Sequence, residues 1–217
     1  MPETGPCGTP SCDHSQRHSK LAALDVHLPP DPDELDATIR AEADRLLGSG
    51  LRDVLSEFGE VSIIGSYSLH LMAWRDLDIE IVRADSSRRA FFDLGYRVAE
   101  CLSPTRMQYR DETVAQTPGL PMGWYWGVYL GDERKGAWKI DIWSVDRRQA
   151  DAREASDRRL QAALTPDARR AIVVIKSQVW ADPGYRRTFS SQDIYDAVLG
   201  GGIRDLAGFR DFLRGRT

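Results

Sequence analysis

Cysteine, lysine and long apolar runs are all scarce in this chain of 217 residues. Its three cysteines, an odd number, do not indicate a disulfide framework. No stretch approaches the roughly 20 consecutive apolar residues that a membrane helix needs, and the amino-terminal region lacks the apolar core of a secretion signal. We therefore expect a protein of the reducing cytoplasm without a membrane span.

Only four residues are lysine, arginine supplies the rest of the positive charge, and the net charge is −4. Such a chain has no overall basic field to attract a polynucleotide. Composition therefore favours a small-molecule or protein partner over nucleic acid, and it leaves open a local basic groove. The length suffices for one large domain or two small ones, and the sequence leaves the oligomeric state open.

The first 20 residues are rich in Pro, Gly, Ser and Thr and poor in apolar side chains, which predicts a tail without fixed structure. The tail carries four soft metal ligands, and zinc binding is one interpretation of them. The Cys-x-His spacing is not usual for zinc, so we favour the plain tail. The four ligands are Cys7, Cys12, His14 and His18.

Hydrophobic periodicity divides the remaining chain into a mixed α/β half over residues 21–146 and an all-helical half over 147–217. The first helix begins near Asp31, which can cap it, and Pro32 suits its first position. Gly48 and Gly50 break or kink this helix. Strands are predicted over 61–64, 76–82, 104–114, 123–130 and 137–144, and further helices over 86–102, 147–163, 167–181, 191–199 and 204–213. The fold class is therefore α/β (α+β), a mixed sheet flanked by helices and followed by a helical domain.

Three carboxylates occupy two of the predicted strands. Side chains alternate between the faces of a strand, so Asp76 and Asp78 point to one face, and Asp141 joins them if its strand is a neighbour. Carboxylates this close raise one another's pKa unless cations compensate. Magnesium prefers oxygen ligands, and manganese can replace it. Two such ions could activate an attacking oxygen and stabilise a leaving pyrophosphate.

A Gly-Ser turn directly follows the first predicted strand. Gly65 permits a tight turn and the close approach of a phosphate to backbone N–H groups. The Ser66 hydroxyl can donate to a phosphate oxygen, and a helical turn after it would direct further N–H groups at the same anion.

The order of these motifs resembles the signature of the DNA polymerase beta-like nucleotidyltransferase superfamily over about residues 60–145. Gly65 and Ser66, nine residues, and Asp76-Leu77-Asp78-Ile79 match the first part, and Ile140-Asp141-Ile142 looks like the third carboxylate. The resemblance implies a palm domain in which Asp76 and Asp78 bridge two metal ions. It further implies that Asp141 holds the catalytic metal and that the Gly-Ser turn binds the triphosphate of a nucleotide.

The helical half resembles the poly(A) polymerase and oligoadenylate synthetase branch, in which a helix lysine and a serine after the next loop contact the triphosphate. By that resemblance, Lys176 and Ser190 or Ser191 contact phosphate. The alternative is that Lys176 extends along an amphipathic helix to reach solvent, and that Ser191 caps the next helix.

Several residues near these motifs have open roles. Glu80 shares the face of the aspartates and is a ligand, a base or, as we favour, an edge charge. Lys139 shares the face of Asp141 and can offset its charge. Arg186 and Arg187 lie on a loop near Ser190, where they reach phosphates or are solvated. The aromatic residues over 122–129 are better explained as core than as a stacking surface.

We interpret the chain as a two-metal nucleotidyltransferase that moves a nucleoside monophosphate from ATP or another triphosphate to a hydroxyl, with release of pyrophosphate. Its size and acidity resemble the small antibiotic-modifying branch, so a small-molecule acceptor is expected and nucleic acid is disfavoured. Two alternatives stand beside this one. One is AMP transfer to a protein hydroxyl, as in antitoxin-like members, and the other is a non-catalytic nucleotide-binding module.

Overall fold

The computed structural model describes residues 31–82 and 87–216. The predicted tail and its four soft ligands lie outside these residues. Within them, no helix is both long enough and apolar enough to cross a membrane.

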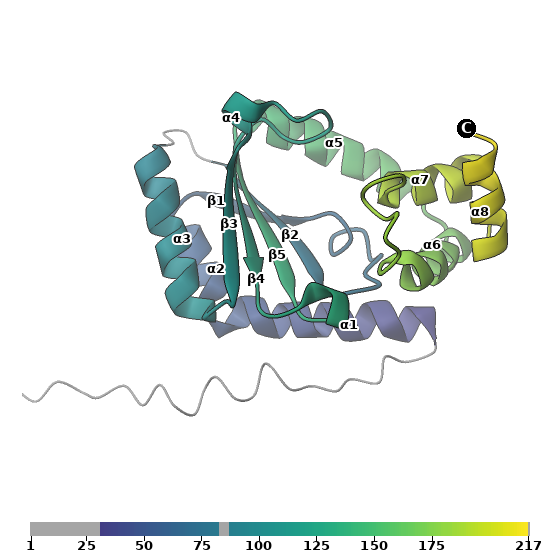
Figure 1. Cartoon of the computed structure of the whole chain (residues 1–217), viewed down its shortest axis with the longest axis horizontal. Helices are drawn as coiled ribbons and strands as arrows, with labels where there is room; N and C mark the ends of the chain where they lie inside the picture. Colours follow the sequence, from purple (N-terminus) through teal and green to yellow (C-terminus); the bar gives the residue numbers. More distant parts are fainter. Residues whose placement is uncertain (1–30, 83–86, 217) are drawn as a thin grey trace, which may run out of the picture.

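A five-stranded mixed sheet with the order β1-β2-β5-β4-β3 forms the centre of the molecule (Figure 1). Strands β2 and β5 are parallel, and the other neighbours are antiparallel. This arrangement, with helices around the sheet, confirms the predicted fold class. The strands are β1 (Glu60–Ile64), β2 (Asp76–Val82), β3 (Arg106–Asp111), β4 (Trp124–Tyr129) and β5 (Lys139–Val145).

One face of the sheet is apolar because every second residue of its central strands is Leu or Ile. Leu77 and Ile79 of β2 and Ile140 and Ile142 of β5 are fully buried in the main core. This core continues into three of the helices in the amino-terminal half. They are α1 (Pro32–Leu46), α2 (Arg52–Ser56) and α3 (Arg88–Leu102).

The first helix starts as predicted. The Asp31 side chain accepts a hydrogen bond from the Asp33 backbone N–H, and Pro32 takes the first helical position. The expected kink is a π-helical stretch, η1 (Leu47–Leu51), in which Gly50 has φ of 108°. Such a positive φ favours glycine, so this residue redirects the chain from α1 into α2.

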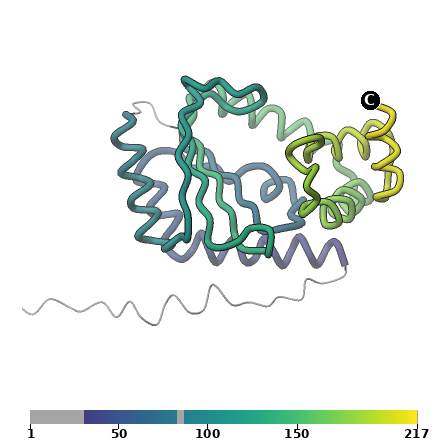
Figure 2. Tube along the Cα trace, viewed as in Figure 1, coloured from purple at the N-terminus to yellow at the C-terminus, as the bar shows by residue number. Residues whose placement is uncertain are grey.

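The carboxyl-terminal half is helical. Its first helix runs alongside the sheet, and the later helices gather at one end of the sheet (Figure 2). Helix α1 extends past the sheet and contacts α6, so the halves on either side of residue 146 share packing. The predicted domain boundary stays a prediction. The helices are α5 (Arg147–Ala163), α6 (Pro166–Val179), α7 (Ser191–Tyr195), η3 (Asp196–Gly200) and α8 (Leu206–Arg214).

Helix α5 contacts β2 and has no buried residue. Two polar contacts fix its amino-terminal end. Arg147 forms a two-pronged ion pair with Glu60 of β1. Gln149 exchanges two hydrogen bonds with the backbone of Met122, its amide N–H donating at 2.7 Å and its carbonyl accepting at 2.8 Å. Polar contacts therefore anchor the start of α5, and the partly buried Ala150 and Leu160 pack against apolar residues further along the helix.

Two short elements were not predicted, a helical turn α4 (Glu112–Ala115) and a 3-10 turn η2 (Glu133–Lys135). Each begins at an aspartate whose side chain accepts a hydrogen bond from the backbone two residues on. Such local capping needs no hydrophobic periodicity, which is why apolar patterning does not reveal it.

We predict opposite effects for two glycine substitutions. A Cβ at Gly95 of α3 would lie 2.6 Å from the Trp126 indole, which its 2.9 Å hydrogen bond to the Phe91 carbonyl holds in place. Gly95→Ala should therefore lower the free energy of unfolding by about 1–3 kcal/mol. A Cβ at Gly48 would have no heavy atom within 4 Å, so Gly48→Ala should raise that free energy by about 0.5–1 kcal/mol. Urea denaturation measures both, and a Gly95→Ala protein as stable as wild type would contradict the packing described.

Candidate active site

The structure brings the three predicted carboxylates onto one patch of the sheet. Asp78 of β2 and Asp141 of β5 are direct register partners, and Asp76 lies two residues earlier, opposite Lys139. Asp76 is 8% exposed and Asp141 is 9% exposed. Side-chain alternation predicted that Asp141 joins the other two only if its strand is a neighbour, and the parallel pairing of β2 with β5 meets this condition.

Two cationic side chains contact this patch. The Lys139 ammonium lies 3.5 Å from Asp76 Oδ1 and 2.5 Å from Asp141 Oδ2, so it bridges two carboxylates. Arg186, on the loop between α6 and α7, forms an ion pair with the other oxygen of Asp76. Burial acts to raise the pKa of Asp76, but the charges of Lys139 and Arg186 outweigh it and lower that pKa.

Asp78 has a pKa shifted in the opposite direction to that of Asp76. Burial first, and then the charges of Asp76 and Asp141, raise the pKa of Asp78 to about 7. The nearby Lys139 and Arg186 only partly oppose this shift. At Asp78, burial and the two neighbouring carboxylates therefore outweigh the attraction of the nearby cations.

This donor set has the chemistry of a magnesium or manganese site, because all three groups offer hard carboxylate oxygens on one patch. Over residues 31–82 and 87–216, no three Asp, Glu, His or Cys side chains already surround a common point as metal ligands would. Lys139 and Arg186 hold carboxylate oxygens that a metal ion would need. A divalent cation would thus take the place of existing ion pairs.

Gly65 of the Gly-Ser turn allows one carboxylate to approach the backbone closely. Its φ of 64° lies in the left-handed region, and a Cβ there would be 2.8 Å from Asp78 Oδ2. Ser66 follows, and its hydroxyl accepts a hydrogen bond from the Lys176 ammonium at 2.7 Å. The turn therefore links the carboxylate patch to helix α6.

Lys176 lies inside the protein, with no exposed surface, rather than extending to solvent. Its ammonium also donates to the Leu71 carbonyl at 2.8 Å. Burial lowers the pKa of Lys176 to about 8, although the charges of Asp76 and Asp78 act in the opposite direction. The structure thus places this lysine in direct contact with Ser66, the other residue expected to bind phosphate.

The two predicted serines have different surroundings. The Ser190 backbone N–H and hydroxyl both donate to Asp193 Oδ2, at 2.7 and 3.0 Å, which makes Ser190 the cap of α7. The Ser191 hydroxyl contacts the Tyr185 hydroxyl at 2.7 Å. Burial raises the pKa of Tyr195 to about 12, and the nearby hydroxyls of Ser66 and Ser191 partly oppose that shift. Ser191 and the Gly-Ser turn therefore lie near the same phenol.

Sequence reasoning missed Tyr195 as part of this site. Its signal was the spacing of four residues from Ser191, which puts both side chains on the same face of a helix. The sequence does not show which face of this helix meets the Gly-Ser turn.

The loop that joins the turn to β2 is held between two helices. Asp36 of α1 accepts from the Met72 backbone N–H at 2.7 Å, and Glu42 of α1 pairs with Arg75 at 2.5 Å. From α6, Arg169 donates to a backbone carbonyl of the same loop. These contacts fix the position of the Gly-Ser turn relative to the first two carboxylates.

A pocket of about 210 Å³ opens beside Asp76, between the sheet and the loop that follows α6. It combines aromatic rings with an excess of cations over carboxylates. Its rings are Trp74, Tyr129, Trp180 and Tyr185, its cations are Arg75, Arg134, Lys139, Arg186 and Arg187, and its carboxylates are Asp76, Glu133 and Asp182. We call this the basic-aromatic pocket.

A groove of about 370 Å³ lies between β1, β2 and α5, and acidic residues outnumber arginines along it. Glu80 lies at its base. We expected an edge charge there, but Glu80 is 3% exposed and lies 3.5 Å from Arg153 of α5. The expectation was wrong because α5, a helix later in the chain, covers this end of the strand.

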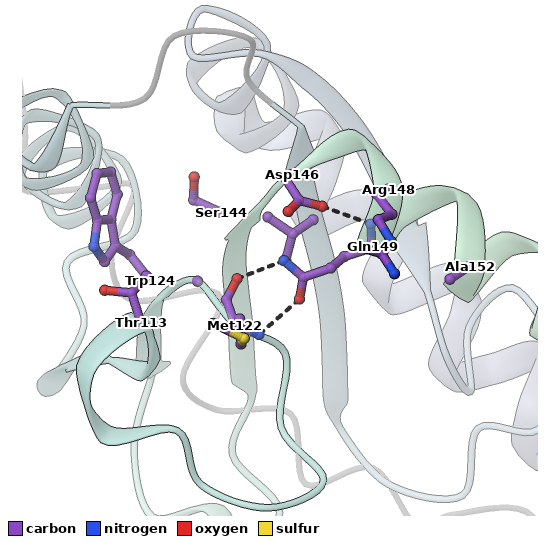
Figure 3. Close-up of a pocket in the computed structure, with 10 residues that line it drawn as sticks. Thr113, Met122, Trp124, Ser144, Asp146, Arg148, Gln149 and Ala152 are labelled. Carbon is purple, nitrogen blue, oxygen red and sulfur yellow. Dashed lines mark hydrogen bonds between the residues drawn. The ribbon is translucent and has the colours of Figure 1, made fainter.

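A larger hollow of about 600 Å³ lies at the far end of β5 (Figure 3). Trp124, Asp146, Arg148 and Gln149 contribute to its lining, and Gln149 joins α5 to the Met122 backbone across it. Its lining includes neither the three carboxylates Asp76, Asp78 and Asp141 nor the phosphate-contact candidates. Its size therefore does not make it the active site.

No family model matches this chain, and no curated protein does. Among solved structures, the fold is similar to the polymerase core of TRAMP, an RNA surveillance complex, with a TM-score of 0.51 and 13% identity. That match covers 83% of this chain and 61% of the other. A cytoplasmic RNA terminal U-transferase matches with a TM-score of 0.43 and 16% identity, over 77% of this chain and 46% of that one. The first likeness shows the fold, and this chain spans about three fifths of that structure's length.

The expectation of a small-molecule acceptor, with nucleic acid disfavoured, is wrong. A solved structure that shares this fold is the polymerase core of an RNA surveillance complex. The physical reason for the error is that a net charge of −4 is a sum over the whole chain. It does not reveal that cations concentrate in the basic-aromatic pocket beside Asp76.

We predict that Asp78→Asn stabilises the metal-free protein near neutral pH. Because the pKa of Asp78 is raised to about 7 in the folded state, the unfolded chain binds fewer protons between about pH 4 and 7, and wild-type stability falls as pH rises through that window. In EDTA at pH 7.5, the free energy of unfolding of the variant should exceed that of wild type by at least about 1 kcal/mol. The difference should shrink towards pH 4.

Urea denaturation at several pH values measures this difference. Asp53→Asn, at an exposed position on α2, serves as the control and should follow the wild-type profile. An Asp78→Asn protein that is no more stable than wild type at pH 7.5 would contradict the crowded charge described for this patch.

Proposed function

We propose that this chain is a metal-dependent nucleotidyltransferase that moves a nucleoside monophosphate from a triphosphate, with ATP as the expected donor, to a terminal hydroxyl of RNA and releases pyrophosphate. The observation that carries this proposal is the meeting of three carboxylates with a Gly-Ser turn that a buried lysine contacts. The similarity in fold to the TRAMP polymerase core supports it.

The carboxylates have distinct places in this reaction. Asp76 and Asp78, on one strand, would hold both ions, and Asp141, on the neighbouring strand, would complete the site nearer the attacking hydroxyl. Two magnesium or manganese ions, when bound, would lower the pKa of that hydroxyl and compensate the charge of the leaving pyrophosphate. Asp141 would also accept the proton of that hydroxyl once Lys139 gives up its contact.

Ser66 and Lys176 would bind the outer phosphates. An ammonium has three N–H donors, and Ser66 and the Leu71 carbonyl take two of those of Lys176. The third remains for a phosphate oxygen. Arg186 would exchange Asp76 for a phosphate, since guanidinium groups bind both anions through paired N–H donors. The ion pairs of the resting protein thus become contacts to substrate.

The basic-aromatic pocket supports RNA as the acceptor. Single-stranded RNA is bound by stacking of its bases on aromatic rings and by cations along its phosphates. This pocket offers both beside Asp76. The acidic groove beneath α5 on the other side of the site lacks this combination.

Turnover tests the proposal directly. Incubation with labelled triphosphates, magnesium and a single-stranded oligoribonucleotide should add nucleoside monophosphates to the 3′ end, which mass spectrometry detects. Asp76→Asn and Asp141→Asn should each reduce turnover to background, because an amide is a weaker and uncharged metal ligand. Asp167→Asn, at an exposed position on α6, should retain full activity. Full turnover by Asp76→Asn would sink the mechanism.

Charge reversal tests the acceptor. Arg134→Glu and Arg187→Glu should each weaken binding of a fluorescent single-stranded RNA and reduce the dependence of log affinity on log salt by about 1. Arg89→Glu, on the exposed surface of α3, is the matched control. RNA affinities that respond equally to all three changes would argue against the basic-aromatic pocket as the binding surface.

A further inference from the structure

The third carboxylate has a different partner on each oxygen. The Tyr125 hydroxyl of β4 donates to Asp141 Oδ1 at 2.7 Å. The Lys139 ammonium donates to Asp141 Oδ2 at 2.5 Å. One partner is uncharged and the other is a cation, so an incoming divalent ion would repel only Lys139.

The sheet register brings the phenol to this oxygen. Tyr125 is opposite Trp143, and Gly127 is opposite Asp141. The Tyr125 side chain therefore reaches diagonally across position 127 to contact the carboxylate. Its ring packs on Trp143, with 4.8 Å between the ring centroids, and Tyr125 is only 7% exposed. The phenol is thus fixed by packing as well as by its hydrogen bond.

Gly127 keeps the path of the phenol open. A Cβ at this position would lie 2.5 Å from the Tyr125 hydroxyl oxygen and 3.0 Å from the ring carbon that bears it. The absence of a side chain on β4, directly opposite Asp141, is therefore what allows the hydroxyl to lie over the carboxylate. This glycine is explained by close approach and not by backbone conformation, because its φ is not positive.

We propose that Tyr125 is a positioning residue that holds Asp141 Oδ1, so that Asp141 presents Oδ2 alone to a divalent cation. Lys139 occupies Oδ2 in the resting protein and gives it up when the ion binds. A carboxylate free to rotate can bind an ion through one or both oxygens, whereas hydrogen bonds from outside the ligand set fix one geometry. Gly127 belongs to the same device. This inference rests on the proposed function, since it assigns Asp141 to a metal ion.

The test is a titration with Mn²⁺ alone, followed by isothermal calorimetry and by the electron paramagnetic resonance signal of free Mn²⁺. Tyr125→Phe keeps the ring on Trp143 and removes only the hydroxyl. We expect Mn²⁺ affinity to fall about tenfold or more. The thermal midpoint of the metal-free protein should fall by only several degrees, because one buried hydrogen bond is lost and the ring packing is kept. Tyr109→Phe is the matched control, because its hydroxyl also lies near a carboxylate, 3.5 Å from Asp111, on strand β3.

Non-additivity gives a second, independent measurement. Gly127→Ala should also weaken Mn²⁺ binding, because its methyl group displaces the Tyr125 hydroxyl. The double variant Tyr125→Phe/Gly127→Ala should bind Mn²⁺ more tightly than the sum of the two single losses predicts, since both changes remove the same hydrogen bond. If Gly127→Ala does not fold, Tyr125→Phe still decides the matter.

Unchanged Mn²⁺ affinity in Tyr125→Phe overturns the inference, as does a wild-type protein that binds no Mn²⁺. The nucleotide-transfer assay judges the proposed function separately. Turnover by wild type together with wild-type Mn²⁺ affinity in Tyr125→Phe would remove the inference alone. Weakened Mn²⁺ binding without any nucleotide transfer would remove the proposed function alone.

Discussion

Three carboxylates crowd one partly buried face of the sheet, and the surrounding structure has to compensate their charge. Buried like charges cost free energy unless cations or hydrogen bonds compensate them. Here one cation, Lys139, comes from β5 itself, and two come from the helical half of the chain: Lys176 from α6 and Arg186 from the loop after α6. The helical half is therefore tied to the sheet by charge as well as by apolar packing.

Two glycines shape the same patch from opposite sides. Gly65 leaves room for Asp78 beside the turn, and Gly127 leaves room for the Tyr125 hydroxyl above Asp141. In both cases the missing Cβ lets a polar group approach a backbone that any larger residue would keep away. The aspartates thus carry the charge of the site, and the two glycines leave the space that its polar groups need.

Local pattern was sufficient for much of the fold and for the carboxylates. Alternation of Asp with Leu and Ile predicted the polar face of β2, and Ile140 and Ile142 marked Asp141 in the same way. Capping chemistry predicted the start of α1. These features depend on neighbours in the chain, which a single sequence displays.

Features that depend on distant segments were out of reach. The contact of Tyr125 with Asp141 requires the β4–β5 register, and the nearness of Tyr195 to Ser66 requires the docking of α7 against the turn. Burial of Glu80 requires α5 to cover its strand. The acceptor was misjudged for a related reason, because net charge averages over a surface on which Arg134 and Arg187 are concentrated in one pocket.

Helix α5 lies against the polar face of the sheet with no fully buried side chain. Polar contacts of Arg147, Gln149 and Arg153 hold it, together with the partly buried Ala150 and Leu160. Substitutions on a surface of this kind change stability by only about 0.5 kcal/mol. Its exposed positions can thus accept substitutions while the core and the carboxylates stay unchanged. Evolution can remodel the chemistry that borders the reaction centre on this side without disturbing the fold that holds the centre together.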